Sequence, residues 1–361
     1  MENVKFKPGQ EWLDTDGVPI QAHGGQIIYD NGKYYWIGEN KNMTTSLNCP
    51  YWHNGVQCYS SSDLYNWKNE GTILKPNDDI NSPLCRKRII DRPHILYNKK
   101  TNKYVMWIKF TGTPDKPKDW STQHAGIAVC DKINGDYELV AEFFPNGECM
   151  GDFDFVEDTA TGTMYIYFSH IIGPNPSDVL CMRLTEDYLG VEEGSVSYFP
   201  YGSPPASREA PALFKYGGKI YLATSGTSGY NPNPSMIAEA AKCEGPWTVL
   251  GDICVGDDTK STFHSQISCI FKHHEKDLYI AVADRWLIDL DLQYLPEIHN
   301  IYRILQSGKP QTDTNYTWAD AMKYSMRDTS KARYVWLPIK FTDEGRPYIE
   351  WADEWSLEDI E

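Results

Sequence analysis

The chain has 361 residues, 34 of them basic and 50 acidic, which gives a formal net charge of −16 at pH 7. A surface this acidic repels phosphate backbones and anionic lipids, so nucleic acid and membrane surfaces are excluded as expected partners. Aromatic residues make up 13% of the chain. Most are expected to be strand core residues, but this abundance also suits carbohydrate, whose rings present apolar C–H faces to Trp and Tyr.

The nine cysteines are scattered, and no pair has Cys-x-x-Cys spacing. This spacing and the odd number argue against a disulfide framework and a structural zinc site, and favour a reducing compartment. Residues 1–5 carry no apolar signal segment, and no run approaches the roughly 20 apolar residues of a membrane span. We therefore expect a cytoplasmic protein, or a secreted or periplasmic one if a signal peptide has been removed. The sequence makes no prediction of the oligomeric state.

Short aromatic and β-branched segments separated by Gly, Asn, Asp and Pro run through the chain, with few helix-length amphipathic patterns. One pattern, a polar or Gly turn followed by Tyr and apolar residues, recurs five times. Its strands are expected around Tyr35, Tyr104, Tyr165, Tyr221 and Tyr279, which lie 56 to 69 residues apart. Each copy follows a shorter strand, expected at 26–29, 94–97, 152–156, 212–215 and 267–271. Outer strand pairs are clearest at 56–60 with 67–74, 126–129 with 137–142, and 235–239 with 247–251.

Two inner and two outer strands form a four-stranded blade, so five copies predict an all-β fold, a five-bladed β-propeller. No linker or change of composition interrupts the repeats, which indicates one domain over residues 1–361. Residues 1–20 are expected to be a lead-in segment. Residues 334–361 hold two closing strands, at 334–341 and 346–351, which either complete the fifth blade or close the ring with the N-terminus.

In a propeller, residues just ahead of each innermost strand, or at its start, point into the central channel, and pockets form at one end of it. This position carries a polar or ionisable residue in every blade, immediately before an apolar strand. The five positions read Ala22-His23-Gly24-Gly25, Asp91-Arg92-Pro93, Gly151-Asp152-Phe153-Asp154, Arg208-Glu209-Ala210-Pro211 and His264-Ser265-Gln266. The sequence thus predicts a site to which all five blades contribute.

Carboxyl groups at these positions suit hydrolysis of a glycosidic bond, which needs a proton for the leaving oxygen and an activated water or a nucleophile. Glu209 is the candidate general acid, because neighbouring carboxylates would raise its pKa and keep it protonated near neutrality. Asp152, at the matching point of the third blade, is placed to cause this shift, although Asp154 on the same strand face could be confused with it. The structural alternatives are a salt bridge between Glu209 and Arg208 and a turn role for Asp152.

Further polar and aromatic residues near these positions are candidates for binding a sugar. Asp91 suits a bidentate contact with a hydroxyl, while Arg92 suits pairing with a carboxylate. Tyr230, Trp286 and Trp336 are candidate platforms for sugar rings. The candidate substrate-binding residues are His23, Glu39, Asp91, Arg208, Tyr230, His264, Asp284, Trp286 and Trp336, with a structural role as the alternative for His23 and Glu39. No cofactor is expected to be required, although the acidic channel makes a structural Ca²⁺ conceivable.

Taken together, these residues resemble glycoside hydrolase family 43 over nearly the whole chain, and its exo-β-1,3-galactanase branch in particular. The motifs are His23-Gly24-Gly25 before Tyr34-Tyr35-Trp36-Ile37-Gly38-Glu39, Asp91-Arg92-Pro93, Arg208-Glu209-Ala210-Pro211, Thr224-Ser225-Gly226, Ser265-Gln266, Asp284-Arg285-Trp286 and Tyr334-Val335-Trp336-Leu337-Pro338. The resemblance implies an inverting hydrolysis with Glu209 as general acid. It also implies that Asp152 is the carboxylate that orients Glu209 and raises its pKa.

The chain departs from most of that family before its first inner strand. There the family places a catalytic-base Asp, whereas this chain reads Ala22-His23-Gly24-Gly25. The galactanase branch shares this absence and is thought to use a glutamine to hold the water, which the resemblance places at Gln266. Asp91 stands where that branch tends to have Glu.

We therefore expect an exo-acting glycosidase that removes terminal galactose from β-1,3-galactan and arabinogalactan-type glycans. One alternative is an α-L-arabinofuranosidase or β-galactofuranosidase on the same fold. The other is a non-catalytic carbohydrate-binding propeller, which the missing base residue makes credible.

Overall fold

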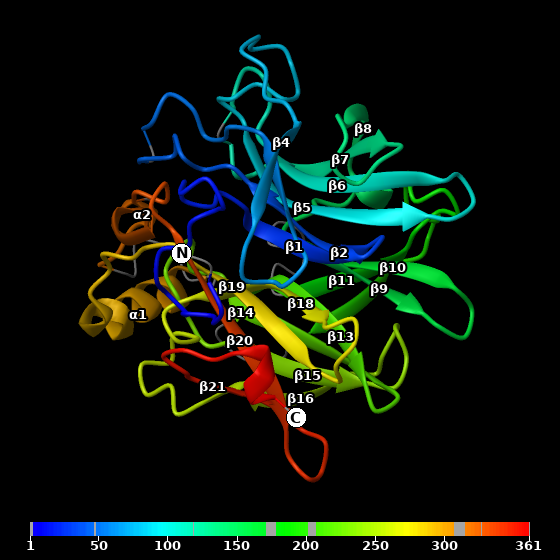
Figure 1. Cartoon of the computed structure of the whole chain (residues 1–361). Coiled ribbons are helices and arrows are strands. Elements are labelled where there is room, and N and C mark those ends of the chain that lie inside the picture. Colours follow the sequence, from blue (N-terminus) through cyan, green and yellow to red (C-terminus); the bar gives the residue numbers. More distant parts are fainter. Residues whose placement is uncertain are drawn as a thin grey trace.

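Five sheets are arranged around a central axis in the computed structural model of the chain (Figure 1). The structure describes residues 3–46, 48–117, 119–170, 178–200, 207–306, 315–325 and 327–360. Within these residues, four sheets have four strands and one has five, which confirms the expected all-β, five-bladed propeller. None of the described helices is long and apolar enough to cross a membrane.

The first strand of each blade lies innermost, and the others follow it outward. The first blade contains β1 (His23–Asp30), β2 (Lys33–Glu39), β3 (Val56–Ser61) and β4 (Lys68–Leu74). The second contains β5 (Ile89–Asn98), β6 (Lys103–Thr111), β7 (Gln123–Cys130) and β8 (Glu138–Phe143). The third contains β9 (Phe153–Asp158), β10 (Thr163–Ser169), β11 (Asp178–Arg183) and β12 (Ser197–Pro200). The fourth contains β13 (Arg208–Tyr216), β14 (Lys219–Gly226), β15 (Met236–Ala240) and β16 (Thr248–Asp252).

The fifth blade settles where the closing strands lie. It contains β18 (Gln266–Lys272), β19 (Tyr279–Arg285), β20 (Arg333–Phe341) and β21 (Pro347–Glu350), with β17 (Cys254–Val255) parallel to β21 at the outer edge. The two expected closing strands therefore complete the fifth blade. Around the axis, β1 contacts β5 and β18, and β13 contacts β9 and β18.

The hydrophobic core consists of layers between neighbouring blades. Side chains on the inner strand β6 are buried on both faces, whereas β8, at the outer edge, alternates between exposed and partly buried residues. A strand's side chains alternate between its two faces, so a strand packed on both sides needs apolar residues at successive positions. Representative pairs that share a layer are Ile37 with Met106, Trp107 with Phe168, Tyr167 with Leu213, and Ala223 with Val282.

Trp336 belongs to this core and not to the channel mouth, which corrects its prediction as a sugar platform. Its side chain lies on β20, is 1% exposed, and its ring centroid is 4.7 Å from that of Trp36. Phe6 of the lead-in segment stacks on it at 5.9 Å and on Trp355 at 4.2 Å. Backbone hydrogen bonds between Phe6 and Trp355 join the lead-in to the C-terminal segment.

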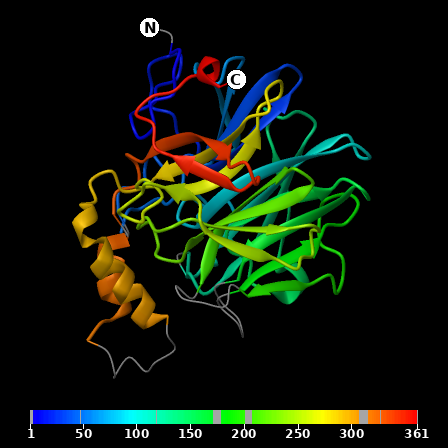
Figure 2. The same ribbon diagram turned by 90° about the horizontal axis from the view of Figure 1, so that it is seen from below.

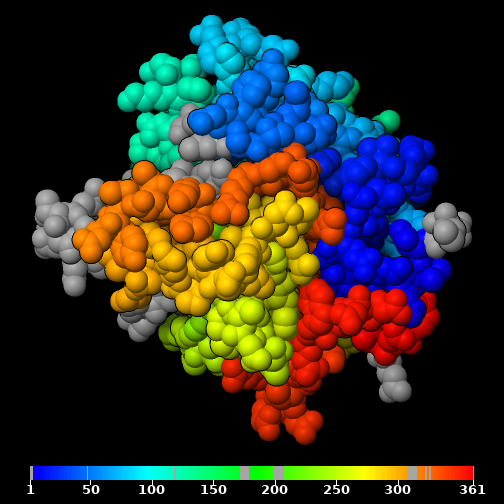
Figure 3. All heavy atoms as spheres, turned by 90° about the vertical axis from the view of Figure 1, so that its left-hand side faces the viewer, coloured from blue at the N-terminus to red at the C-terminus, as the bar shows by residue number. Residues whose placement is uncertain are grey.

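A helical insertion between β19 and β20 was not anticipated from the sequence. It contains the short 3₁₀ turn Leu292–Tyr294, α1 (Leu295–Leu305) and α2 (Trp318–Ser325). Proline in its first turn suits the start of α1, and one apolar face of α1 packs into a cluster with Trp286. The helices lie at the end of the ring where the inner strands begin (Figure 1) and project from the body of the propeller (Figure 2). Figure 3 looks onto this face, where the yellow and orange atoms of the insertion cover a large area beside the first and fourth blades.

Two further 3₁₀ turns lie at Pro145–Gly147 and Leu357–Asp359. None of the nine cysteines, all within the described residues, forms a disulfide.

Candidate active site

A pocket of about 200 Å³ opens at the end of the channel where the inner strands begin. Its described lining comes from all five blades and from the loops beside them. The lining residues are Glu39, Asp91, Arg92, Lys109, Trp120, Gln123, Asp152, Glu209, Thr227, Gly229, Tyr230, Gln266 and Trp286. The three predicted catalytic residues and four of the predicted substrate-binding residues are therefore brought together.

In three blades the backbone has the same local conformation at the start of the inner strand, and this conformation directs a side chain toward this end of the channel. His23, Asp91 and Glu209 are each followed by a residue in the left-handed region, with φ values of 59°, 55° and 50°. In each of the three strands the pairing register then shifts before the ladder resumes. A bulge of this kind turns side chains away from the regular alternation, and non-glycine residues in the left-handed region are concentrated at functional sites. The inner strands therefore begin earlier than their apolar patterns indicate.

Glu209 occupies a buried position in which its neutral form is favoured. Its side chain is 8% exposed, and its Oε1 accepts a hydrogen bond of 3.1 Å from Nε2 of Gln266. Burial raises the pKa of Glu209 to about 8, and the charge of Asp152 acts in the same direction. Glu209 is therefore protonated near neutrality, as a general acid must be.

Asp152 is held in the opposite state by two cations. Its Oδ1 lies 2.7 Å from Nζ of Lys109, and its Oδ2 lies 3.1 Å from Nη2 of Arg92. Burial alone would raise the pKa of Asp152, but these cations outweigh burial and hold the pKa at about 2. Two neighbouring carboxyl groups with pKa values driven apart are the arrangement by which acid and base roles are divided.

Asp154, which the sequence could not separate from Asp152, has a structural position. Its Oδ2 accepts a hydrogen bond of 2.7 Å from the backbone of Leu213 on the neighbouring blade, and its Oδ1 lies 3.3 Å from Nδ1 of His94. It does not line the pocket.

The side-chain amide of Gln266 joins several blades at the centre of the site. Its Oε1 accepts hydrogen bonds from Arg92 Nη2 at 2.6 Å and from Trp286 Nε1 at 3.1 Å. Its Nε2 donates to Glu209 and, at 2.8 Å, to Oγ of Ser225. Because arginine and tryptophan are donors only, the oxygen of the amide must face them, and the orientation of the amide is determined.

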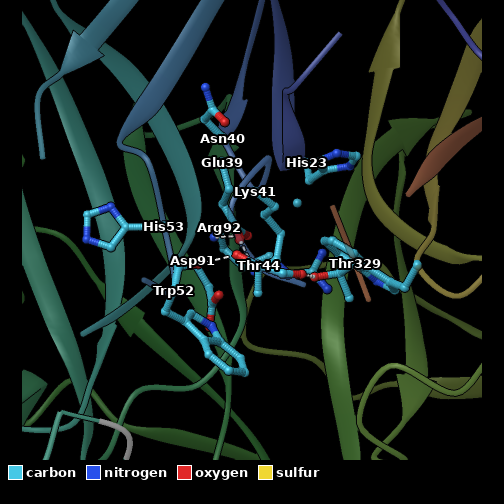
Figure 4. A network of polar contacts seen from close by, with 12 residues as sticks. His23, Glu39, Asn40, Lys41, Thr44, Trp52, His53, Asp91, Arg92 and Thr329 are labelled. Carbon is cyan, nitrogen blue, oxygen red and sulfur yellow. Dashed lines mark hydrogen bonds and ion pairs between the residues drawn. The ribbon is translucent and has the colours of Figure 1, made fainter. Parts of the chain in front are cut away.

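Glu39 and Asp91 complete the acidic lining on the side of the first two blades. Glu39 is 2% exposed and accepts hydrogen bonds of 3.1 Å from Nζ of Lys41 and from the backbone N–H of Arg92. Burial raises the pKa of Glu39 to about 8, although Lys41 opposes this shift. Asp91 pairs with Nζ of Lys109 at 2.9 Å. Figure 4 shows how Glu39, Lys41, Asp91 and Arg92 converge.

The ammonium group of Lys41 lies among three aromatic rings. Nζ is 5.7 Å from the ring centroid of Trp52, 5.5 Å from that of Tyr230 and 5.8 Å from that of Trp286. Cation–π attraction over this distance supports a buried ammonium group. Lys41 thereby links Tyr230 and Trp286 of the pocket wall to Glu39.

Three predicted substrate-binding residues lie behind the pocket wall, which corrects their assignment. The imidazole of His23 is fully buried, with Nδ1 3.0 Å from Oδ1 of Asp284, and Asp284 also accepts from the backbone of Gly24. Arg208 donates from Nε to Oγ1 of Thr224 at 3.0 Å. Each of these side chains is directed at neighbouring protein groups and supports the wall.

His264 also lies outside the described lining. Its Nε2 is 2.9 Å from the backbone oxygen of Leu287, and burial lowers the pKa of His264 to about 4, which keeps the imidazole neutral.

Several lining residues were missed by sequence reasoning, and only one left a usable signal. Lys109 stands directly opposite Asp91 in the pairing of β5 with β6, so a correct register would have found it. Trp120, Gln123, Thr227 and Gly229 come from loops or strand ends whose positions no periodic pattern indicates.

Three of the pocket carboxylates are paired with cations. Lys41, Arg92 and Lys109 stand between them, and no group of three or more His, Cys, Asp or Glu among the described residues is arranged to hold a metal ion.

Comparison with known proteins identifies the family of the chain. A β-1,3-galactosidase of family 43 is 29% identical over 99% of this chain, with a TM-score of 0.77, and the chain spans 65% of its length. A second β-1,3-galactosidase of family 43, solved with galactodeoxynojirimycin, is 27% identical over 98% of this chain and all of its own, with a TM-score of 0.78. An exo-β-1,3-galactanase from Phanerochaete chrysosporium, solved with galactose, is 26% identical over 98% of this chain and 68% of its own, with a TM-score of 0.75. No curated protein sequence matches the chain.

The family model described as glycosyl hydrolases family 43 matches residues 18–281, which include the first four blades and most of the two inner strands of the fifth. This range holds Glu209, Asp152 and Gln266. The chain is therefore a glycoside hydrolase and belongs to glycosyl hydrolases family 43.

Proposed function

We propose that this enzyme is an inverting exo-glycoside hydrolase that releases terminal galactose from β-1,3-galactan and arabinogalactan-type glycans. The observation that carries the proposal is the pair Glu209 and Asp152, whose pKa values are driven to about 8 and about 2 in one pocket. The similar solved structures with galactosidase and galactanase activities favour galactose as the sugar.

In this mechanism Glu209 donates its proton to the glycosidic oxygen as the bond to the anomeric carbon breaks. Asp152 remains ionised throughout, because Lys109 and Arg92 stabilise its charge. Its negative charge keeps the proton on Glu209 until the leaving oxygen develops charge of its own. Water attacks the opposite face of the sugar, so the released galactose has the inverted anomeric configuration.

Gln266 is assigned the role of holding the attacking water. Both lone pairs of its Oε1 accept hydrogen bonds from permanent donors, so the amide does not take up the proton of the water. Its two N–H groups contact Glu209 and Ser225, so one of them must turn from its partner to the water when substrate is bound. The proton must pass to a carboxylate, and Glu39 and Asp91 line the same pocket.

A substrate panel tests the proposal. We expect the wild type to release galactose from β-1,3-galactobiose and from β-1,3-galactan, and to be much slower on aryl α-L-arabinofuranosides and β-D-galactofuranosides. Proton NMR of the first product should show inverted configuration. Preferential cleavage of a furanoside would contradict the galactanase assignment in favour of a furanosidase. A product with retained anomeric configuration would overturn the mechanism.

A further inference from the structure

A second cavity, of about 420 Å³, adjoins the active-site pocket. One wall is the loop that follows β14, at residues 226–234, and the other is a face of α1. Thr227 lines both cavities. The helical insertion therefore builds a space next to the pocket that the propeller alone does not provide.

The second cavity lies on the side of the general acid. In the pairing of β13 with β14, Glu209 stands opposite Ser225 and Arg208 opposite Gly226. Gly226 begins the wall of the second cavity, and Thr227 follows it. A general acid protonates the oxygen of the leaving group, so the leaving part of a substrate extends from the pocket past Glu209. The second cavity begins where that part leaves the pocket.

Side-chain contacts hold the two walls of this cavity together. Nε2 of Gln306, at the C-terminal end of α1, donates to the backbone oxygen of Thr227 at 2.6 Å. Nε2 of His299 lies 2.9 Å from the backbone oxygen of Pro232. The loop and the helix are thus fixed relative to each other, and the cavity is a built feature of the fold.

The lining has the chemistry of a site for neutral hydroxyl groups. Asn300 and Arg303, one turn apart on α1, pair through Oδ1 and Nη2 at 2.5 Å and present amide and guanidinium donors. No acidic residue is found among its described lining residues, and Tyr302 adds an aromatic side chain. Oγ1 of Thr227 is buried without a hydrogen-bond partner among the described residues. Such groups bind sugar hydroxyls through hydrogen bonds and apolar contact.

We propose that this second cavity binds the leaving portion of the substrate, the sugar residues on the reducing-end side of the cleaved bond. This proposal rests on the proposed hydrolysis of a galactan chain. Affinity for the leaving chain would then come from α1, while the propeller binds the terminal sugar and performs the chemistry.

The test compares substrates with long and short leaving groups. We would measure kcat/KM for β-1,3-galactotriose and for an aryl β-galactoside in the wild type, in Arg303→Ala and in the double variant Asn300→Ala/Arg303→Ala. Glu297→Gln is the matched control, because Glu297 is an exposed residue of α1 outside the cavity lining. Thermal melting of each variant checks that α1 remains folded.

Loss of one or two hydrogen bonds should lower kcat/KM for galactotriose about 3- to 10-fold more than for the aryl galactoside. Glu297→Gln should show no such difference between substrates. Equal losses on both substrates, or no loss, would overturn the second cavity as a site for the leaving chain. If the wild type cleaves neither substrate, the proposed function fails. Calorimetric titration with galactotriose then shows whether the second cavity binds the sugar chain. In that titration, unchanged affinity in the double variant overturns the proposal.

Discussion

Gln266 donates a hydrogen bond of 3.1 Å to the carboxyl group of Glu209, so the amide proposed to hold the water also contacts the proposed acid. Removal of this amide in Gln266→Ala takes away two donors and removes one acceptor shared by Arg92 and Trp286. We expect kcat to fall by about 10²-fold or more, because both the water and the acid lose their orientation. Ser225→Ala, which removes only one partner of the amide, should have a much smaller effect. Near-normal kcat in Gln266→Ala would show that the amide has no part in catalysis.

The role of Glu209 as general acid predicts a dependence on the leaving group. Glu209→Gln cannot supply a proton, so hydrolysis of galactobiose should slow by about 10²- to 10⁴-fold. A dinitrophenyl galactoside, whose leaving group needs no proton, should be affected far less. Steady-state kinetics on both substrates measure the difference. A uniform loss on both substrates contradicts the assignment.

The raised pKa of Glu209 predicts how activity responds to pH. The protonated form is the active form, so kcat should fall as the pH rises through about 8. Asp152→Asn removes the charge that helps to raise this pKa, so the alkaline fall should begin at lower pH in that variant. The measurement is kcat against pH for both proteins. An alkaline fall at the same pH in both would show that Asp152 does not act on Glu209.

The lowered pKa of Asp152 has a consequence for acid stability. Its pKa is about 2 when folded, against an ordinary value of 3.8, so ionised Asp152 stabilises the native state above pH 3.8. This contribution is lost as the pH falls through the folded pKa, because the unfolded state binds the proton first. Asp152→Asn should therefore show a weaker decline of melting temperature between pH 4 and pH 2 than the wild type. Parallel declines would contradict this contribution.

The buried pair of Lys41 and Glu39 predicts a non-additive effect on stability. Lys41→Met leaves the carboxyl group of Glu39 buried without its cation, and breaking such a pair destabilises a protein by about 3–5 kcal/mol. Glu39→Gln in the same chain removes the unpaired carboxyl group and should restore part of the loss. Urea unfolding of the two single variants and the double variant measures the coupling. Additive losses would show that the two charges do not interact.

The parts of the site that the sequence predicted are those that repeat with the blades. Asp91, Asp152, Glu209 and Gln266 all line the pocket, because each stands at the same position relative to an apolar strand and the ring brings equivalent positions together. The first blade is the exception, because His23 stands at this position but lies behind the pocket wall and pairs with Asp284.

The parts that the sequence did not reveal depend on contacts between distant segments. Trp286 directly follows β19 and Trp336 lies within β20, yet only Trp286 lines the pocket, because the lead-in segment covers Trp336. The helices of the insertion have only 11 and 8 residues, so their apolar pattern repeats over few turns. Lys41 is buried only because three aromatic rings from three segments meet around it.

The indole of Trp286 contacts both the catalytic site and the helical insertion. Its N–H donates to Gln266, while its ring packs in the apolar cluster that supports α1. A change that shifts the insertion would therefore also shift a hydrogen bond inside the ring of catalytic side chains. Variation in the insertion among related enzymes is thus constrained by the reaction itself, and grafting a different insertion onto this propeller would succeed only if it left this indole in place.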